Sequence, residues 1–144
     1  GQIGQYVHGN EPSHHIAYLY AWSDRPWKTR ELVSRIVRDF YTDRPDGIIG
    51  NDDCGQMSAW YVLSTLGFYP VVPASGAYVL GATQVSAAQV RLAGGKVLQV
   101  KRGDLGKEGT PVHATLNGKP VDPVALGHQQ LVAGGTLVFL GRQR

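Results

Sequence analysis

The sequence predicts an α+β protein in which helices occupy residues 1–72 and an antiparallel, sandwich-like β region occupies residues 73–144. Apolar residues recur at helical spacing in the first part and alternate in the second. All three Trp and six of the seven Tyr lie in residues 1–72, whereas 12 of the 19 Gly lie in residues 73–144. The first part has six Lys and Arg against eight Asp and Glu, and the second has eight against three. These contrasts indicate two differently built regions.

Three helices are expected in the first region, over residues 12–23, 27–41 and 56–66. The first follows Asn10 as a cap, and its apolar side chains nearly encircle it, as in a helix that is packed on most sides. The second begins after Pro26 and is amphipathic, with five charged residues on its exposed face. The third ends at Gly67, a residue type that favours a helix C-terminus.

The β region follows an extended segment, residues 68–73, whose two prolines prevent the helix from continuing. Short strands are expected at residues 90–92, 97–100, 112–116, 120–121 and 136–140. Gly94–Gly95 and Asn117–Gly118 are hairpin signals between successive strands. Such strands need a second sheet or a helix layer to cover their apolar face.

Composition excludes several classes of protein. At 42% hydrophobic and 17% charged residues, the chain is typical of a folded protein. Its single Cys54 excludes an internal disulfide framework and a zinc site built from cysteines. We expect no membrane partner, because no apolar run could cross a bilayer, and no nucleic acid, because the basic residues are dispersed among glycines. The chain opens on Gly1 rather than Met, so the lack of a signal peptide identifies no compartment.

Two polar clusters are the most informative parts of the sequence. Residues 50–60 place two adjacent carboxylates between glycines, directly before an apolar helical run. Residues 9–15 have the same layout about forty residues earlier, since they are polar, begin with a glycine and open a helix. Carboxylates gather in this way to hold a metal ion, to activate water or to cap a helix. Two acidic helix starts predict a shared cleft that serves hydrolysis or metal binding.

Helix capping is the simplest alternative for these carboxylates. Asp52 and Asp53 would accept the free amides of the third helix, at about 0.3–1 kcal/mol each, and Asn10 and Glu11 would do the same for the first. Two details favour a functional site. Residues 51–53 supply three polar side chains where a cap needs one acceptor. In addition, two histidines enter an otherwise apolar helix, where a buried polar ring requires a partner.

The available donors favour calcium over zinc. His14 and His15 would point about 100° apart on a helix and lack the i, i+4 spacing of a zinc pair. Calcium prefers oxygen atoms from carboxylates, amides and loop carbonyls, which Asn10, Glu11 and Asp53 supply. The calcium loop of EF-hand proteins has no counterpart in the sequence.

The remaining polar residues of the second cluster have structural interpretations. Cys54 is more typical of a small buried thiol than of a nucleophile, and Ser58, inside the helical run, is more typical of a structural hydroxyl. The aromatic residues near both clusters are typical of a core, although aromatic faces beside carboxylates also suit sugar rings.

Four ungapped motifs, at residues 9–15, 26–29, 50–61 and 67–70, resemble glycoside hydrolase family 92, and residues 115–120 and 134–137 look like the family's C-terminal strands. The resemblance spans nearly the whole chain. It implies a calcium-dependent exo-α-mannosidase, in many members an α-1,2-mannosidase, that acts on mannose-containing glycans and is secreted or periplasmic. In fold, it implies the last helices of an (α/α)6 barrel followed by a C-terminal β region.

The resemblance also assigns roles in catalysis and metal binding. Asp53, with Asp52 beside it, corresponds to the general base of an inverting hydrolase, which activates water while an acid on the opposite face protonates the leaving oxygen. Asn10, Asp53 and a main-chain oxygen near His8 correspond to the calcium site. Some members have an acidic residue in place of Asn51, so activation of water would rest more heavily on Asp53 here.

Substrate contacts are assigned in the same way to Glu11, His14 and Gln56. The family's general acid is a Glu upstream of these motifs, and neither Glu11, Glu31 nor Glu108 matches it. The resemblance therefore implies that the 144-residue chain is inactive without the N-terminal remainder of its parent.

Two other functions stay open on the sequence alone. One is a non-catalytic, calcium-dependent carbohydrate-binding module, which would stand without a barrel. The other is a structural helix–sheet domain whose acidic loops only cap helices.

Overall fold

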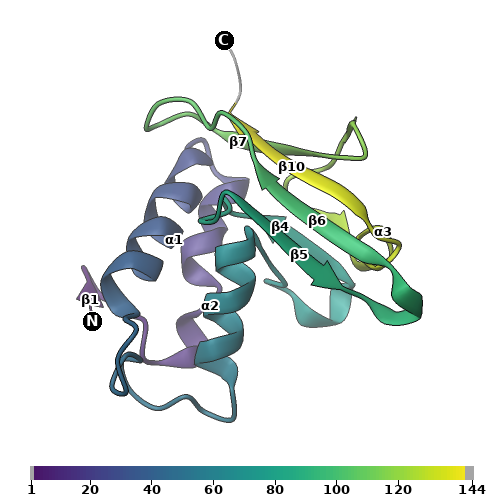
Figure 1. Cartoon of the computed structure of the whole chain (residues 1–144). Helices are drawn as coiled ribbons and strands as arrows, with labels where there is room; N and C mark the ends of the chain where they lie inside the picture. Colours follow the sequence, from purple (N-terminus) through teal and green to yellow (C-terminus); the bar gives the residue numbers. More distant parts are fainter. Residues whose placement is uncertain (1, 142–144) are drawn as a thin grey trace.

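The computed structural model describes residues 2–141. Its helices lie beside its sheets (Figure 1). The helical part consists of a short hairpin, β1 (Gln2–Ile3) and β2 (Tyr6–Val7), followed by η1 (Glu11–Ser13), η2 (Ile16–Trp22), α1 (Trp27–Phe40) and α2 (Gln56–Leu66). Within residues 2–141, none of these helices has the length and apolar character needed to span a membrane.

The first predicted helix differs from the prediction. η1 and η2 are short 3-10 helices, and the chain is irregular between them at His14 and His15. Asn10 precedes η1, but its side chain makes no capping hydrogen bond. The interruption has a tertiary cause, because Trp60 Nε1 donates to the His14 main-chain oxygen at 3.0 Å and so satisfies a carbonyl that an α-helix would use internally.

The 3-10 geometry leaves an apolar row on η2. A 3-10 helix has three residues per turn, so Ile16, Leu19 and Trp22 lie on one side of it. They are 41%, 46% and 54% exposed, whereas Ala17 and Tyr18 are buried. The sequence predicts a helix packed on most sides, and within residues 2–141 this side is not covered.

α1 and α2 agree with the prediction to within a residue or two. Gly67 ends α2 in a left-handed conformation, with φ of 106°, and its N–H donates to the carbonyls of Leu63 and Ser64. A Cβ atom at Gly67 would lie 2.5 Å from the ring of Phe139. The glycine thus serves both as the helix cap and as the point where α2 approaches the sheet most closely.

Within residues 2–141, the strands that follow the β1–β2 hairpin form two sheets. One has five strands in the order β5-β6-β10-β7-β8, namely β5 (Ala87–Arg91), β6 (Val97–Arg102), β10 (Gly135–Gly141), β7 (Val112–Leu116) and β8 (Lys119–Pro120). The other has three, β3 (Phe68–Tyr69), β4 (Ala77–Leu80) and β9 (Leu126–Gly127), with the short helix α3 (His128–Val132) after β9. Short 3-10 turns also lie at Pro73–Ser75 and Ala93–Gly95. Each predicted strand overlaps a strand of the larger sheet, and both hairpins are confirmed.

One strand pair corrects the prediction of an antiparallel region. β10 is antiparallel to β7 but parallel to β6, in the register Leu137 to Val100. Parallel neighbours require a long crossover connection, and the 32 residues 103–134 between these strands provide it. The remaining strand pairs within residues 2–141 are antiparallel.

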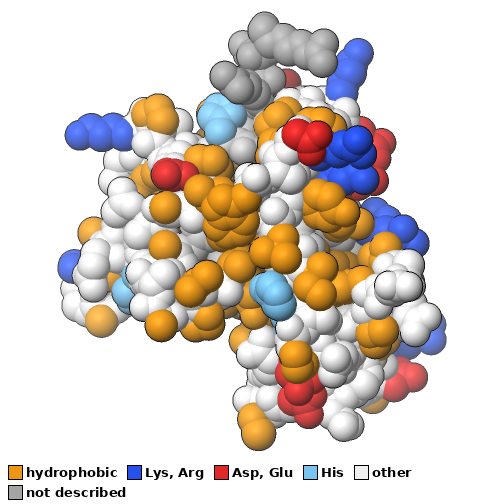
Figure 2. Space-filling model, turned by 180° about the vertical axis from the view of Figure 1, so that it is seen from behind, with side chains coloured by type: hydrophobic (Ala, Val, Ile, Leu, Met, Phe, Trp, Pro, Cys, Tyr) orange, Lys and Arg blue, Asp and Glu red, His pale blue; other side chains and the backbone are white. Residues whose placement is uncertain are grey.

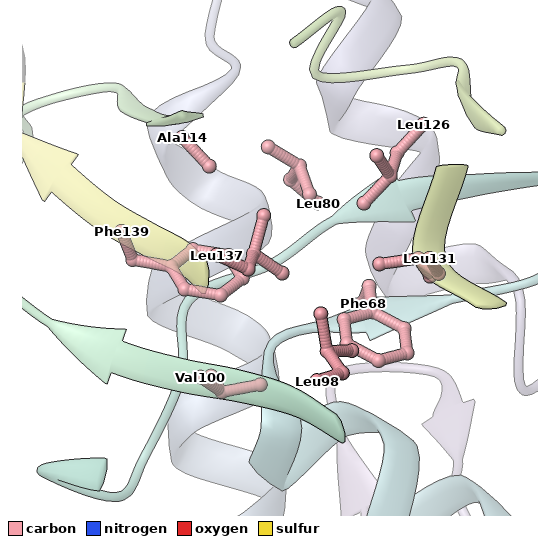
Figure 3. Packing of buried hydrophobic residues seen from close by; sticks show 9 residues of the cluster. All are labelled: Phe68, Leu80, Leu98, Val100, Ala114, Leu126, Leu131, Leu137 and Phe139. Carbon is pink, nitrogen blue, oxygen red and sulfur yellow. The ribbon is translucent and has the colours of Figure 1, made fainter. Parts of the chain in front are cut away.

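The two sheets enclose an apolar core, which Figure 3 shows from close by. Its buried members come from both sheets and from α3: Phe68, Leu80, Leu98, Val100, Ala114, Leu126, Leu131, Leu137 and Phe139. A second core lies in the helical part and consists of Ala17, Tyr18, Val33, Ile36, Trp60 and Val79. The β region is therefore sandwich-like, and the helical core lies next to the two polar clusters.

Candidate active site

The two polar clusters meet, as the sequence predicts. A Cβ atom on Gly9 would lie 3.3 Å from the Ile49 main-chain oxygen, and one on Gly50 would lie 3.4 Å from the Gly9 oxygen. Gly50 also has a φ of 79°. Glycine at both positions lets the loop after β2 contact the loop before α2 main chain to main chain. We refer to residues 8–11 as the first acidic loop and to residues 50–55 as the second acidic loop.

Asp52 caps the helix that follows it. Its Oδ1 accepts hydrogen bonds from the main-chain N–H and the Oγ–H of Ser58, both at 2.9 Å. Ser58 is the third residue of α2, where the amide has no partner within the helix. The capping alternative therefore holds for Asp52, and the hydroxyl of Ser58 is structural, as expected.

Asp53 has a different environment. Its side chain is exposed, and within residues 2–141 no amide of α2 donates to it. Its pKa is raised, first by partial desolvation and then by the nearby charges of Glu11 and Asp52. The carboxyl groups of the two acidic loops thus lie close enough for their charges to interact. This contact brings Asp53 and Glu11 together across 42 positions of sequence.

The backbone of the second acidic loop is strained. Asp53, Cys54 and Gly55 are left-handed in succession, with φ of 49°, 58° and 92°. A residue other than glycine in such a conformation costs about 1–3 kcal/mol, and strain of this kind concentrates at functional sites. The same turn exposes Cys54, so the prediction of a buried thiol is wrong. Glycine and aspartate both tolerate a left-handed conformation, but Cys54 between them does not favour it, so the sequence did not predict this turn.

His8 supports the first acidic loop from the interior. Its ring is fully buried, with Nδ1 2.7 Å from Tyr6 Oη and Nε2 2.6 Å from Tyr41 Oη. Burial and the neighbouring His14 lower its pKa to about 3, so the ring is neutral. Both ring nitrogens have partners. What His8 can offer a cation is its main-chain oxygen, the group that the resemblance implicates.

His14 lies against His8 and holds Gln56. The two imidazoles are stacked with centroids 4.6 Å apart. His14 Nε2 donates to the His8 main-chain oxygen at 3.0 Å, which leaves Nδ1 to accept from Gln56 Nε2 at 3.1 Å. The same Gln56 nitrogen also donates to Tyr69 Oη at 3.1 Å. Because burial lowers its pKa and the residue is only 2% exposed, His14 is neutral, and its side-chain partner near the second acidic loop is Gln56.

The oxygen atoms at this meeting point are of the kind that suits a hard cation. Asn10 is exposed and its side chain is free of a capping role. Together with Glu11, Asp53 and the His8 carbonyl, it provides the amide, carboxylate and main-chain oxygens that calcium prefers. A cation bound here would also offset the charge of Glu11 that raises the pKa of Asp53. Among residues 2–141, no three His, Cys, Asp or Glu side chains form a ready-made cluster, so further ligands would be main-chain oxygens, Asn10 and water.

A separate cavity lies away from the acidic loops. It measures about 410 Å³ and is bordered by the start of α1, at Pro26 to Arg30, and by Pro111 to His113. The acidic loops are near the other end of α1, which spans 14 residues and so roughly 20 Å. We therefore place the candidate site at the acidic loops because of the carboxyl groups of Asp53 and Glu11, and not because of the size of a cavity.

Opposed carboxyl groups on an open, glycine-rich surface define a site of the type that hydrolases use. The chain belongs to glycosyl hydrolase family 92, whose catalytic-domain model matches residues 1–141. A solved α-mannosidase of this family, BT3965 from Bacteroides thetaiotaomicron, is 41% identical with a TM-score of 0.87, over 100% of this chain and 20% of that one. The inverting mannosidase BT2199 from Bacteroides thetaiotaomicron VPI-5482 is 36% identical with a TM-score of 0.80, over 96% and 19%.

A curated relative is more distant. It is an uncharacterized secreted glycosidase from Arthroderma benhamiae, 29% identical over 140 residues, which are 94% of this chain and 18% of that protein. The chain therefore spans about one fifth of the length of the relatives it matches. Its fold and family are those of glycoside hydrolases that include α-mannosidases.

Proposed function

We propose that this chain is the C-terminal portion of an inverting, calcium-dependent exo-α-mannosidase in which Asp53 is the general base. The observation that carries the proposal is the contrast within one dipeptide. Asp52 is bound to its own helix, whereas Asp53 is exposed and faces Glu11 in the other acidic loop. Membership of the family, with inverting mannosidases among its solved members, supports the reaction type.

In this mechanism Asp53 removes a proton from water as the water attacks the anomeric carbon. Asp53 suits this role because its carboxyl group is exposed and accepts no hydrogen bond from the amides of α2. Asp52 fixes the main chain beside it through Ser58. An inverting hydrolase also needs an acid about 6.5–9.5 Å from the base, and we assign that acid to a part of the parent outside these 144 residues.

Calcium would be held by the Asn10 side chain, the His8 main-chain oxygen and the carboxylates of Glu11 and Asp53. When bound, it supplies electrostatic stabilisation and orients the hydroxyls of the sugar. Glu11 and Gln56 then bind the remaining hydroxyls, and His14 orients the Gln56 amide through its hydrogen bond. Terminal mannose in an α-1,2 linkage is the proposed substrate, and the named secreted relative supports a secreted or periplasmic location.

Exposed hydrophobic side chains support the proposal that this chain is part of a longer protein, in which these helices would form the end of an (α/α)6 barrel. Figure 2 shows hydrophobic side chains gathered over the middle of one face, with most charged groups toward its edges. Ile16, Leu19 and Trp22 form their exposed row on η2, and residues 12–23 contain no Asp, Glu, Lys or Arg. An uncharged row of this size is typical of a surface that another part of the protein covers. We therefore expect the 144-residue chain to be inactive by itself.

The test is Asp53→Asn in the full-length parent, assayed on an α-1,2-linked mannobiose. We expect turnover to fall about 10²–10⁴-fold, because proton transfer to the base is lost, while the melting temperature stays unchanged. Glu31→Gln on the exposed face of α1 is the control and should retain full turnover. Removal of calcium with a chelator should lower turnover, and calcium should restore it.

Two outcomes would contradict the proposal. An Asp53→Asn enzyme with wild-type turnover would remove the assigned base. Binding of mannose by a parent that hydrolyses no mannoside would instead favour a carbohydrate-binding module.

A further inference from the structure

One hydroxyl group connects the first acidic loop with the start of α2, which directly follows the second acidic loop. Tyr41 follows α1, and its Oη lies 2.6 Å from His8 Nε2 and 3.1 Å from the main-chain oxygen of Met57. His8 is three positions before Glu11 in the chain, and Met57 is four positions after Asp53. The phenol therefore bonds to the His8 side chain, near Glu11 in the chain, and to the Met57 main-chain oxygen, near Asp53.

The directions of these hydrogen bonds follow from the donors available. The Met57 carbonyl can only accept, so the single hydroxyl proton of Tyr41 is donated to it, and His8 Nε2–H donates to Tyr41 Oη. The other ring nitrogen of His8 then accepts from Tyr6 Oη. Burial raises the pKa of Tyr41, so the hydroxyl keeps its proton at any ordinary pH. The available donors and acceptors therefore allow a single arrangement of these hydrogen bonds, in which each O–H and N–H proton is donated.

Tyr41 is itself firmly placed by elements outside both acidic loops. Its ring is parallel to that of Trp60, at an interplanar angle of 7° and a centroid distance of 6.2 Å. Its main chain pairs with Ile48 in an isolated bridge. The hydroxyl is thus a fixed reference point at the end of α1.

We propose that Tyr41 is a positioning residue for the reaction, whose hydroxyl holds the two acidic loops at the separation that catalysis requires. The inference rests on the proposed function of Asp53. Gly9 and Gly50 contact each other through main-chain atoms, and the hydrogen bonds of Tyr41 add a directional connection behind this contact. Besides Tyr41, the pair Gln56 and His14 provides such a connection. A displacement of about 1 Å between reacting groups can cost roughly 100-fold in rate.

The experiment compares Tyr41→Phe with Tyr61→Phe in the full-length parent. Tyr41→Phe keeps the ring against Trp60 and removes only the hydroxyl. We expect kcat per folded enzyme to fall about tenfold or more, with a much smaller change in KM. Tyr61 is the matched control, because its ring lies 4.7 Å from that of Tyr41, it is 37% exposed, and its hydroxyl makes no hydrogen bond within residues 2–141. Its kcat should stay within about twofold of wild type.

A double variant separates positioning from other roles. If Tyr41 acts through the placement of Asp53, then Tyr41→Phe should cause no further loss in an Asp53→Asn background. Full additivity of the two losses would overturn the inference. So would a Tyr41→Phe enzyme with wild-type kcat and a lower melting temperature, because Tyr41 would then be an ordinary core residue.

The two proposals fail in different ways. Wild-type turnover in Asp53→Asn removes the proposed function, whereas loss of turnover in Asp53→Asn together with wild-type kcat in Tyr41→Phe removes only the role of Tyr41. If Tyr41→Phe does not fold, Tyr6→Phe is tested instead. This variant removes the hydrogen bond to His8 Nδ1 and should lower kcat by about threefold. Wild-type kcat in that variant would then overturn the inference.

Discussion

The two cores of this molecule are built from different residues. The core between the sheets consists of nine buried apolar side chains. Beside the helical core lie the buried polar side chains of His8, His14, Thr29 and Ser64. Both histidines bond at each ring nitrogen, and the Ser64 hydroxyl bonds to Tyr18 Oη at 2.8 Å.

The difference separates two tasks. An apolar core holds elements together without specifying which polar atoms meet. A hydrogen-bonded core costs more to build, because each buried polar group must find its partner, but its directional bonds fix the loops above it. We infer that the sheet core supplies stability and the helical core supplies the geometry of the acidic loops. Three experiments on the full-length parent can break or sharpen this comparison.

The largest effect is expected from Phe139→Ala in the sheet core. Phe139 is fully buried and its ring reaches the main chain at Gly67. Losing a buried Phe costs about 3–5 kcal/mol of stability, which urea denaturation would measure. Activity per folded molecule should not change, because no polar contact of the acidic loops is lost. Val97→Ala, at a 38% exposed strand position, is the control. A large loss of specific activity in Phe139→Ala would show that the two cores are not separable.

A smaller effect is expected from pH. The pKa of His8 is about 3 in the folded protein and about 6.5 in an unfolded chain. As pH falls below 6.5 the unfolded state takes up a proton that the folded state does not, so stability is lost at about 1.4 kcal/mol per pH unit. His14, whose pKa is also lowered, acts in the same direction.

Urea midpoints between pH 7 and pH 5 would test this dependence. His8→Gln should flatten it, whereas His15→Gln, whose ring lies outside the buried stack, should not. Equal slopes in the wild type and in His8→Gln would contradict the assignment of a neutral, buried His8.

The smallest effect is expected from Asp52→Ala. Losing the cap on Ser58 should cost about 1 kcal/mol of stability, with a modest loss of turnover. Asp53→Ala should leave stability undiminished, since it removes a carboxyl group that faces Glu11. If Asp52 serves stability and Asp53 serves catalysis, Asp52→Ala should have the lower melting temperature and Asp53→Ala the lower turnover. The same ranking in both measurements would contradict that division.

Residue pattern predicted the parts of the fold that local chemistry controls. The amphipathic repeat of α1, the cap at Gly67 and the hairpins at Gly94–Gly95 and Asn117–Gly118 are local signals, and each is confirmed. The meeting of the two polar clusters was also predicted, because both open helices in a short chain. The barrel, the calcium ion and the roles of the site residues stay predictions.

Tertiary contacts decided the rest. The 3-10 form of η2 depends on Trp60, 46 positions from His14, and the parallel pairing of β10 with β6 depends on a long crossover. Neither the 3-10 form nor the parallel pairing can be predicted from the local spacing of apolar residues. The hydroxyls of Tyr6 and Tyr41 were missed for the same reason, since a tyrosine in an aromatic-rich region reads as ordinary core until its oxygen is placed.

The contact between Gly9 and Gly50 limits how this protein can diversify. A side chain at position 9 would press on the Ile49 main-chain oxygen at 3.3 Å, and one at position 50 would have to adopt a strained φ of 79°, so neither glycine is easily replaced. Variation is confined to the rim, where Asn51 and Cys54 are exposed. Substitutions intended to alter this surface would do best to leave the glycines untouched and to change those two rim positions.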